Sequence, residues 1–139
     1  SFPLDEWKRQ YSNNDTPVAM KWLEEHYDPQ DYSFWKVQYR YNDELTQVFM
    51  SSNLITGFHS RLEASRKYVF GSNGVYGTNN NNKIAGVYLI RGSDYKQVFD
   101  VAPDYESYEF TPLDFKADRD FIEGCWSWTN TLDGLEYAD

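Results

Sequence analysis

Cysteine and histidine are scarce in this chain of 139 residues, which has one cysteine, Cys125, and two histidines, His26 and His59. A single cysteine cannot form an intrachain disulfide, as is typical of proteins in a reducing cytosol. Zinc sites need three or four ligands at workable spacing, and neither histidine has a second histidine or a cysteine near it. We therefore predict no disulfide, no metal site and no cofactor, and we expect a cytoplasmic location.

Long apolar runs are absent as well. The longest run, IAGVYLI at residues 84–90, is far shorter than the roughly 20 residues of a membrane-spanning helix. The chain also does not open on a charged and then apolar leader of the secretory type. We predict no transmembrane segment.

Basic side chains are few. Lys and Arg number 13 against 22 Asp and Glu, a net charge of −9, and residues 71–139 hold 5 basic and 12 acidic side chains. A surface that binds nucleic acid must neutralise phosphates with Lys and Arg. Direct DNA or RNA binding is therefore disfavoured, and the local cluster of Arg61, Arg66 and Lys67 is interpreted as the solvated face of a helix.

Aromatic residues are abundant instead, at 19% of the chain, with 12 Tyr, 9 Phe and 5 Trp. Together with an apolar content of 40%, this composition is that of a globular protein rather than a disordered one. A chain of this length can bury one sizeable core without disulfides or metal. We predict a single domain that covers residues 1–139.

Hydrophobic periodicity predicts the order α-α-β-β-α-β-β-β-α. Helices are expected at residues 4–11, 17–26 (capped by Thr16), 53–67 and 117–128, and strands at residues 34–41, 44–51, 68–77, 83–92 and 105–110. Links of hairpin length, including a tight turn at Asn42-Asp43, imply an α+β fold: a mainly antiparallel sheet of about five strands flanked by helices.

The first predicted strand alternates in polarity. Its aromatic side chains, Trp35, Tyr39 and Tyr41, are expected in the core. The intervening Lys36, Gln38 and Arg40 are expected on a wet face, covered by a helix or by a partner.

The stretch FGSNGVYGTNNNNK at residues 70–83 has glycines at Gly71, Gly74 and Gly77. Their spacing does not match the phosphate-binding loop, and the dinucleotide pattern requires a helix directly afterwards, where a strand is predicted. We interpret the stretch as a hairpin with a polar, exposed tip at residues 78–83 and no ligand at the glycines. Asparagine suits such a turn because it tolerates positive φ.

Other candidate chemical groups are expected to be structural. His59 could pair with a serine as a base and a nucleophile, but the G-x-S-x-G pattern of hydrolases is absent. Cys125 lies on an apolar stripe, where a thiol acts as a small hydrophobe. The other candidates are Ser51, Ser52 and Ser60 as a nucleophile, the acidic pairs Asp104 with Glu106 and Asp118 with Asp120, and the glycosylation pattern Asn14-Asp15-Thr16. The acidic pairs are expected to be solvated surface, and the triplet a turn followed by a helix cap.

Four long stretches carry a family resemblance: LDEWKRQYSNNDT, WKVQYRYNDELTQVFMSSNLITGF, VYGTNNNNKIAGVYLIRG and FDVAPDYESYEFTPLD. They closely resemble the C-terminal domain of elongation factor 1-gamma, a subunit of the eukaryotic translation elongation factor 1 complex, and the asparagine run most resembles fungal members. The resemblance implies an antiparallel α+β domain without the family's N-terminal glutathione-transferase-like domain and Lys-rich linker. In this family nucleotide exchange resides in other subunits, and no catalytic or ligand residues are carried over to this chain.

The resemblance and the aromatic, acidic composition together predict a non-catalytic structural or anchoring domain that supports protein synthesis through protein contacts. Its expected partners are the other subunits of the complex, through the full-length protein, and cellular anchoring proteins. Two alternatives remain: a small-molecule or carbohydrate-binding module that uses exposed aromatic residues, and an enzyme that uses His59 or Cys125. The sequence does not identify the residues that contact a partner.

Overall fold

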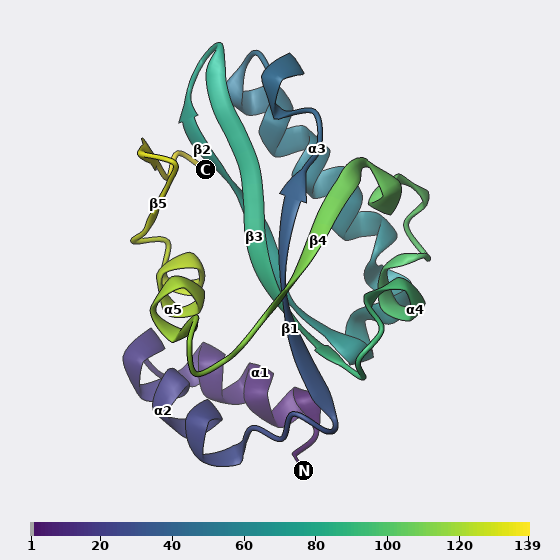
Figure 1. Ribbon diagram of the computed structural model, residues 1–139, viewed down its shortest axis with the longest axis vertical. Coiled ribbons are helices and arrows are strands. Elements are labelled where there is room, and N and C mark those ends of the chain that lie inside the picture. The colour runs from purple at the N-terminus through teal and green to yellow at the C-terminus, as the bar shows by residue number, and fades with distance from the viewer. Residues whose placement is uncertain (1) are drawn as a thin grey trace.

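The centre of the molecule is a four-stranded antiparallel sheet with strand order β2-β3-β1-β4 (Figure 1). A computed structural model describes residues 2–139 of the chain. The strands are β1 (Tyr32–Tyr39), β2 (Val69–Thr78), β3 (Asn81–Arg91) and β4 (Tyr108–Leu113), followed by a small hairpin of β5 (Thr131–Leu132) and β6 (Leu135–Glu136). The predicted α+β class with an antiparallel sheet is confirmed.

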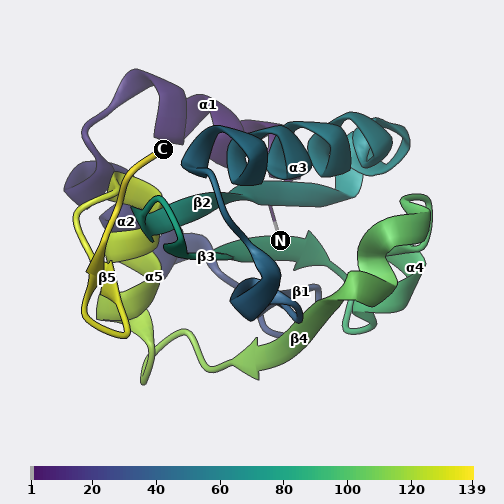
Figure 2. The same cartoon turned by 90° about the horizontal axis from the view of Figure 1, so that it is seen from above.

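Helices cover both faces of this sheet (Figure 2). The α-helices are α1 (Leu4–Asn13), α2 (Thr16–His26), α3 (Val48–Arg61), α4 (Tyr95–Phe99) and α5 (Arg119–Ser127), and the 3-10 helices are η1 (Asn42–Glu44), η2 (Glu63–Tyr68) and η3 (Pro103–Ser107). Helices α1, α2 and α5 pack on one face, and α3 and α4 pack on the other.

Each face has its own core because successive residues of a strand point to opposite sides. The core under α1, α2 and α5 contains the buried rings of Trp7, Phe34 and Trp126. The core under α3 and α4 contains Phe58 and Tyr88. Burying one such side chain contributes about 1.5–3 kcal/mol, so the sheet is stabilised from both sides.

The strand predicted at residues 44–51 is wrong, because η1 ends at Glu44 and α3 begins at Val48. The alternation in this stretch is short, whereas Val48, Ile55 and Phe58 follow helical spacing and pack against the sheet core. Packing of that helical face overrides the local strand pattern.

Other boundaries also differ from the prediction, two of them by three residues or more. The helix expected at residues 53–67 ends at Arg61, and Glu63–Tyr68 form η2. The strand expected at residues 105–110 begins three residues later, because a 3-10 turn with proline at its start precedes it. Element boundaries depend on caps and tertiary hydrogen bonds, which periodicity does not encode.

The first strand ends at Tyr39, so the tight turn predicted at Asn42-Asp43 is replaced by η1. Trp35 and Tyr39 pack against the core under α3, as expected. Tyr41 was also expected in the core, but 43% of its surface is exposed. The chain leaves the sheet before this residue, so no neighbouring strand covers its ring.

The predicted hairpin is confirmed: β2 and β3 pair over their length, and no helix begins at Asn79. Phe70 and Tyr76 pack on one side of the sheet and Val69 and Val75 on the other. Alternation therefore correctly predicts the facing of these four side chains, but not of Tyr68, which was expected beside Phe70 and instead ends η2 with half of its surface exposed.

Two glycines of the hairpin have positive φ, +139° at Gly71 and +115° at Gly77. A Cβ atom at Gly71 would lie 2.3 Å from the Val87 carbonyl oxygen, and one at Gly77 would lie 2.1 Å from that of Asn81. Both glycines allow close approach of the backbone of β3, which is an architectural role.

Candidate functional site

Exposed apolar side chains gather at the start of α3 and just before it. Tyr41 is 43% exposed, Phe49 64%, Met50 51% and Leu54 39%. We call these four residues the apolar patch. They are four of the seven large apolar side chains that are exposed in the described chain, and the stretch from 41 to 54 holds all four. Met50 and Leu54 lie one helical turn apart on α3 and line the same hollow, and adjoining exposed apolar side chains often mark a contact site.

A hollow of about 490 Å³ lies beside the patch, between α3 and the segment that follows β1. We call it the α3 groove. Its lining residues are Tyr39, Glu44, Leu45, Thr46, Met50, Ser51, Asn53, Leu54, Gly57 and Arg61. Within this set Met50, Leu54, Gly57 and Arg61 are spaced four, three and four residues apart, so they form one stripe along α3.

An ion pair closes the far end of the α3 groove. Arg61 donates from Nε to Asp104 Oδ1 at 2.9 Å and from Nη2 to Asp104 Oδ2 at 2.7 Å. These bonds lower the pKa of the Asp104 carboxyl. A Cβ atom at Gly57 would lie 3.1 Å from the Arg61 guanidinium, so the glycine leaves room for Arg61 to fold back along the helix.

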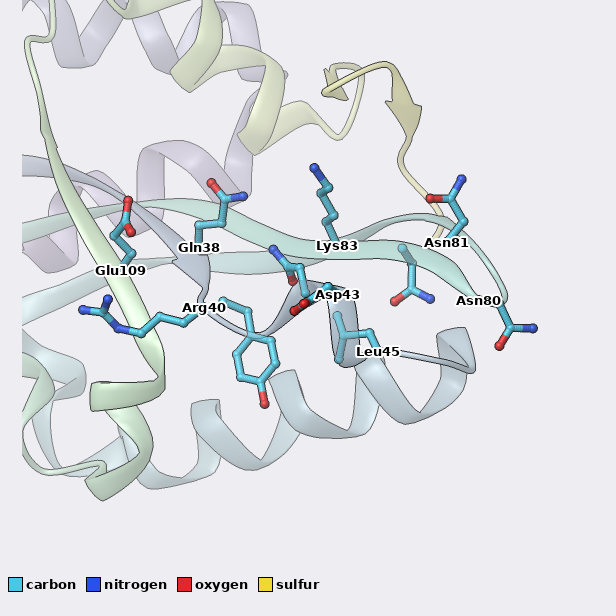
Figure 3. Close-up of a pocket in the computed structure, with 11 residues that line it drawn as sticks. Gln38, Arg40, Asp43, Leu45, Asn80, Asn81, Lys83 and Glu109 are labelled. Atoms are coloured by element: carbon cyan, nitrogen blue, oxygen red, sulfur yellow. The ribbon is translucent and has the colours of Figure 1, made fainter.

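A second hollow of about 430 Å³ lies on the other side of residues 41–47, which we call the η1 loop (Figure 3). We call this hollow the polar groove. Its lining residues are Gln38, Tyr39, Arg40, Asn42, Asp43, Leu45, Asn80, Asn81, Asn82, Lys83 and Glu109. Figure 3 shows Gln38, Lys83 and Glu109 pointing to the same side of the sheet, towards α5. Lys83 Nζ lies 2.9 Å from Asp133 Oδ2, which lowers the pKa of that carboxyl.

The side chains expected on the wet face of β1 have different surroundings. Lys36 lies over the Phe121 ring of α5, 5.4 Å from its centroid. Gln38 lines the polar groove, and Arg40 is exposed and donates from Nε to the Glu106 carbonyl at 3.1 Å. A helix therefore covers only the Lys36 end of this face.

The asparagine run positions the η1 loop. Asn82 Nδ2 donates to the Thr46 carbonyl at 2.9 Å, and Asn79 Oδ1 accepts from the Val48 N–H at 3.0 Å. The second bond satisfies an N–H group in the first turn of α3, which has no partner within the helix. Asn82 is 3% exposed, although the tip at residues 78–83 was predicted to be exposed throughout. This buried role had no signal in the sequence, because it depends on the η1 loop folding back.

The serine and histidine candidates are not brought together. His59 Nε2 lies 3.1 Å from the Tyr88 hydroxyl, and burial lowers the pKa of the imidazole. Ser51 Oγ donates to Asn82 Oδ1 at 2.6 Å, and Ser52 donates to the Asp139 carboxylate. Among the described hydrogen bonds, none joins a serine to His59.

The other histidine and the cysteine have structural surroundings. His26 stacks on Trp22, with ring centroids 4.1 Å apart. Cys125 is buried, with the Tyr76 hydroxyl and the Asn130 amide near its sulfur, and burial raises the pKa of the thiol. A raised pKa opposes formation of the thiolate that acts as a nucleophile.

The acidic candidates are dispersed. Asp104 pairs with Arg61, and Asp118 Oδ2 accepts from the Asp114 N–H at 2.8 Å, next to the start of α5. Glu106 and Asp120 are exposed. In residues 2–139, no group of three or more His, Cys, Asp or Glu side chains has the arrangement of a metal site.

The glycosylation-like triplet and the basic cluster take ordinary roles. Asp15 is the N-cap of α2 and Thr16 its first residue, one position earlier than predicted. Arg61 pairs with Asp104, and Arg66 lies 3.2 Å from Glu63 on the exposed surface of η2.

A third hollow, of about 580 Å³, lies between α2, the end of β4 and the start of α5. Its wall includes the half-buried rings of Tyr27 and Phe115, which contact each other edge to face. Arg119 stands at this hollow and donates to Glu24 and, at 2.6 Å, to Glu123. Its guanidinium is thus already matched by two carboxylates.

Within the described chain, no helix is both long enough and apolar enough to span a lipid bilayer. A family model described as "Elongation factor 1 gamma, conserved domain" matches residues 1–94. The chain is 57% identical over 131 residues to Elongation factor 1-gamma 2 of Saccharomyces cerevisiae. This alignment covers 92% of the chain and 32% of the relative.

Other relatives carry the same name. Identity is 52% over 143 residues to Elongation factor 1-gamma of Schizosaccharomyces pombe, with 100% of this chain and 35% of the relative covered. It is 43% over 139 residues to Elongation factor 1-gamma of Mus musculus, with 95% and 31% covered. The chain spans about a third of the length of these curated relatives. By family model and identity alike, it belongs to the elongation factor 1-gamma family, whose conserved domain it contains.

Proposed function

We propose that this chain is a non-catalytic protein-contact domain, which serves the translation elongation factor 1 complex in the cytoplasm. Residues 1–139 act as one unit whose partners are other proteins of that complex, reached through the full-length protein, or cellular anchoring proteins. The observation that carries the proposal is the apolar patch, because it leaves large side chains in solvent where a partner could cover them.

The composition of the patch supports a contact role. Phe49 and Met50 are more than half exposed, and Tyr41 lies beyond the end of β1. Aromatic and methionine side chains are enriched in protein interfaces, and methionine adapts its shape to a partner. The surroundings of His59 and Cys125 offer no activated nucleophile, which favours contact over catalysis.

The experiment is affinity capture from cell extract on the immobilised chain, with quantitative mass spectrometry of the retained proteins. We expect the double variant Met50→Asp/Leu54→Asp to lose partners that the unmodified chain retains, because a buried carboxylate opposes apolar contact. Val18→Asp is the matched control, since Val18 is 57% exposed on α2, in the opposite layer. Retention of no protein above background by the unmodified chain contradicts the proposal.

The third hollow supports a second candidate, the binding of a small molecule or carbohydrate. Tyr27 and Phe115 line the hollow with half-buried rings, and Arg119 is a polar group beside them. Proton NMR of the chain with a panel of mono- and disaccharides tests it. Line broadening that Phe115→Ala abolishes supports this candidate, and spectra unchanged by every sugar count against it.

A further inference from the structure

We infer that the α3 groove receives a basic amphipathic helix from another protein. This inference rests on the proposed contact function and specifies the chemistry of the partner. The apolar floor, the length of the groove and the charge on its rim each restrict what can occupy it.

The stripe on α3 sets the length of the occupant. It runs from Met50 to Arg61, eleven residues apart, which corresponds to roughly 16 Å or three turns at about 1.5 Å per residue. Leu45 and Tyr39 form the opposite wall. A helix of about three turns with apolar residues at intervals of three and four would place them between these walls.

The backbone around the groove argues against an extended occupant. An added strand needs free N–H and carbonyl groups along an edge. Those of α3 are used within the helix, and on the facing η1 loop the Thr46 carbonyl accepts from the Asn80 N–H at 2.7 Å and from Asn82 Nδ2. Recognition in this groove therefore depends on side-chain packing.

An unpaired carboxylate stands on the rim of the groove. Glu44 lines the groove, is exposed, and forms no ion pair with any described residue, whereas its neighbour Asp43 lines the polar groove. Arg61, the one cation that lines the groove, is neutralised by Asp104. A partner with lysine or arginine on the flank of its apolar face is therefore complementary, whereas an acidic helix would be repelled.

The test uses three synthetic 14-residue peptides, each carrying a fluorescent label. The first has leucine at helical intervals of three and four residues and lysine elsewhere, the second replaces lysine by glutamate, and the third has the composition of the first in an order without helical periodicity. Fluorescence anisotropy in physiological salt measures the Kd of each for the chain. We expect the first peptide to bind at least tenfold more tightly than either of the others.

Variants locate the binding. Leu54→Asp and, separately, Met50→Asp should each raise the Kd of the first peptide at least tenfold, and Glu44→Gln severalfold. Val18→Asp should leave it unchanged, and far-UV circular dichroism confirms that each variant is folded. Equal binding of the first and third peptides overturns the inference, as does an unchanged Kd in Leu54→Asp and Met50→Asp.

The two proposals fail separately. If affinity capture finds partners that depend on Met50 and Leu54 but the basic peptide binds no better than its acidic twin, the contact function stands and the inferred partner chemistry is wrong. If the peptides behave as expected but no cellular protein is retained, the contact function is wrong and the chemistry of the groove stands.

Discussion

At the scale of single residues, His59 couples the packing of α3 to pH. Its ring faces the Tyr88 hydroxyl of β3, and burial lowers the pKa of the imidazole in the folded state. In the unfolded chain the pKa of a histidine is about 6.5. Between the lower folded pKa and pH 6.5, the unfolded chain therefore binds more protons at His59 than the folded chain does. The contribution of His59 to the free energy of unfolding is complete above about pH 6.5 and is lost as the pH falls from that value towards the folded pKa.

We accordingly expect the free energy of unfolding to fall between pH 7.5 and pH 5, and His59→Gln to flatten this dependence. Urea denaturation at several pH values measures it. His26→Gln is the control, because it changes the exposed histidine that stacks on Trp22 and leaves His59 in place. An identical pH profile for the unmodified chain and His59→Gln would contradict the prediction.

Gly71 is a second position where one atom matters. An alanine there would combine an unfavourable φ of +139° with a Cβ only 2.3 Å from the Val87 carbonyl oxygen. We expect Gly71→Ala to lower the free energy of unfolding by about 2–4 kcal/mol. Gly92→Ala isolates the effect of φ, because Gly92 has a φ of +98° and an added Cβ there would meet no atom within 4 Å; it should cost about 1 kcal/mol. Thermal denaturation compares the two, and equal losses would show that the close approach is unimportant.

At the scale of elements, one buried amide joins the β2–β3 hairpin to the η1 loop and α3. Asn82 donates to the Thr46 carbonyl and accepts from Ser51 Oγ. Asn82→Ala removes both bonds and leaves the buried Ser51 hydroxyl without its closest partner, so it should lower the free energy of unfolding by about 1–3 kcal/mol. Asn81→Ala, at the exposed neighbour, should stay within about 0.5 kcal/mol of the unmodified chain.

Amide hydrogen exchange locates the effect of Asn82→Ala. We expect the substitution to increase the exchange rate more in residues 42–51, where the η1 loop meets α3, than in β1. Uniform acceleration throughout the chain would mean that Asn82 supports the whole fold and not the loop specifically.

The elements differ in how well their sequence predicts them. The strands around residues 69–91 follow simple alternation, so their position and pairing are correctly predicted, although the turn between them is shorter than the predicted tip at residues 78–83. The start of α3 is missed because its first turn is satisfied by Asn79, a residue 31 positions away from Val48. The apolar patch is missed for the same reason. Leu54 recurs with Phe58 and Leu62 at helical spacing and Tyr41 alternates with Tyr39, and both patterns predict burial, yet the path of the η1 loop leaves Leu54 and Tyr41 in solvent.

At the scale of the whole molecule, two cores share one sheet. Loss of packing on one face should therefore destabilise the layer on the other face as well. Phe58→Ala removes a ring from the core under α3 and should cost about 3–5 kcal/mol. Phe49→Ala is the control on the same helix, since its side chain is 64% exposed, and should change stability by less than about 0.5 kcal/mol.

Tryptophan fluorescence reports mainly on the opposite layer, because Trp7, Trp22 and Trp126 lie in or against the core under α1, α2 and α5, whereas Trp35 packs against the core under α3. We expect the urea midpoints of Phe58→Ala from fluorescence and from far-UV circular dichroism to coincide, as in a two-state transition. Separate midpoints would show that the two layers unfold independently.

The sequence by itself determined the α+β class, the β2–β3 hairpin and membership of the elongation factor 1-gamma family. These follow from local alternation and from long contiguous motifs, which need no knowledge of distant contacts. The tertiary structure alone decided that residues 48–52 are helical, that Asn82 is buried, that Tyr39, Met50 and Leu54 line an open groove, and that Tyr41 is exposed. Each of these depends on hydrogen bonds or burial between segments far apart in the chain, where the free energy of the assembled fold outweighs local propensity.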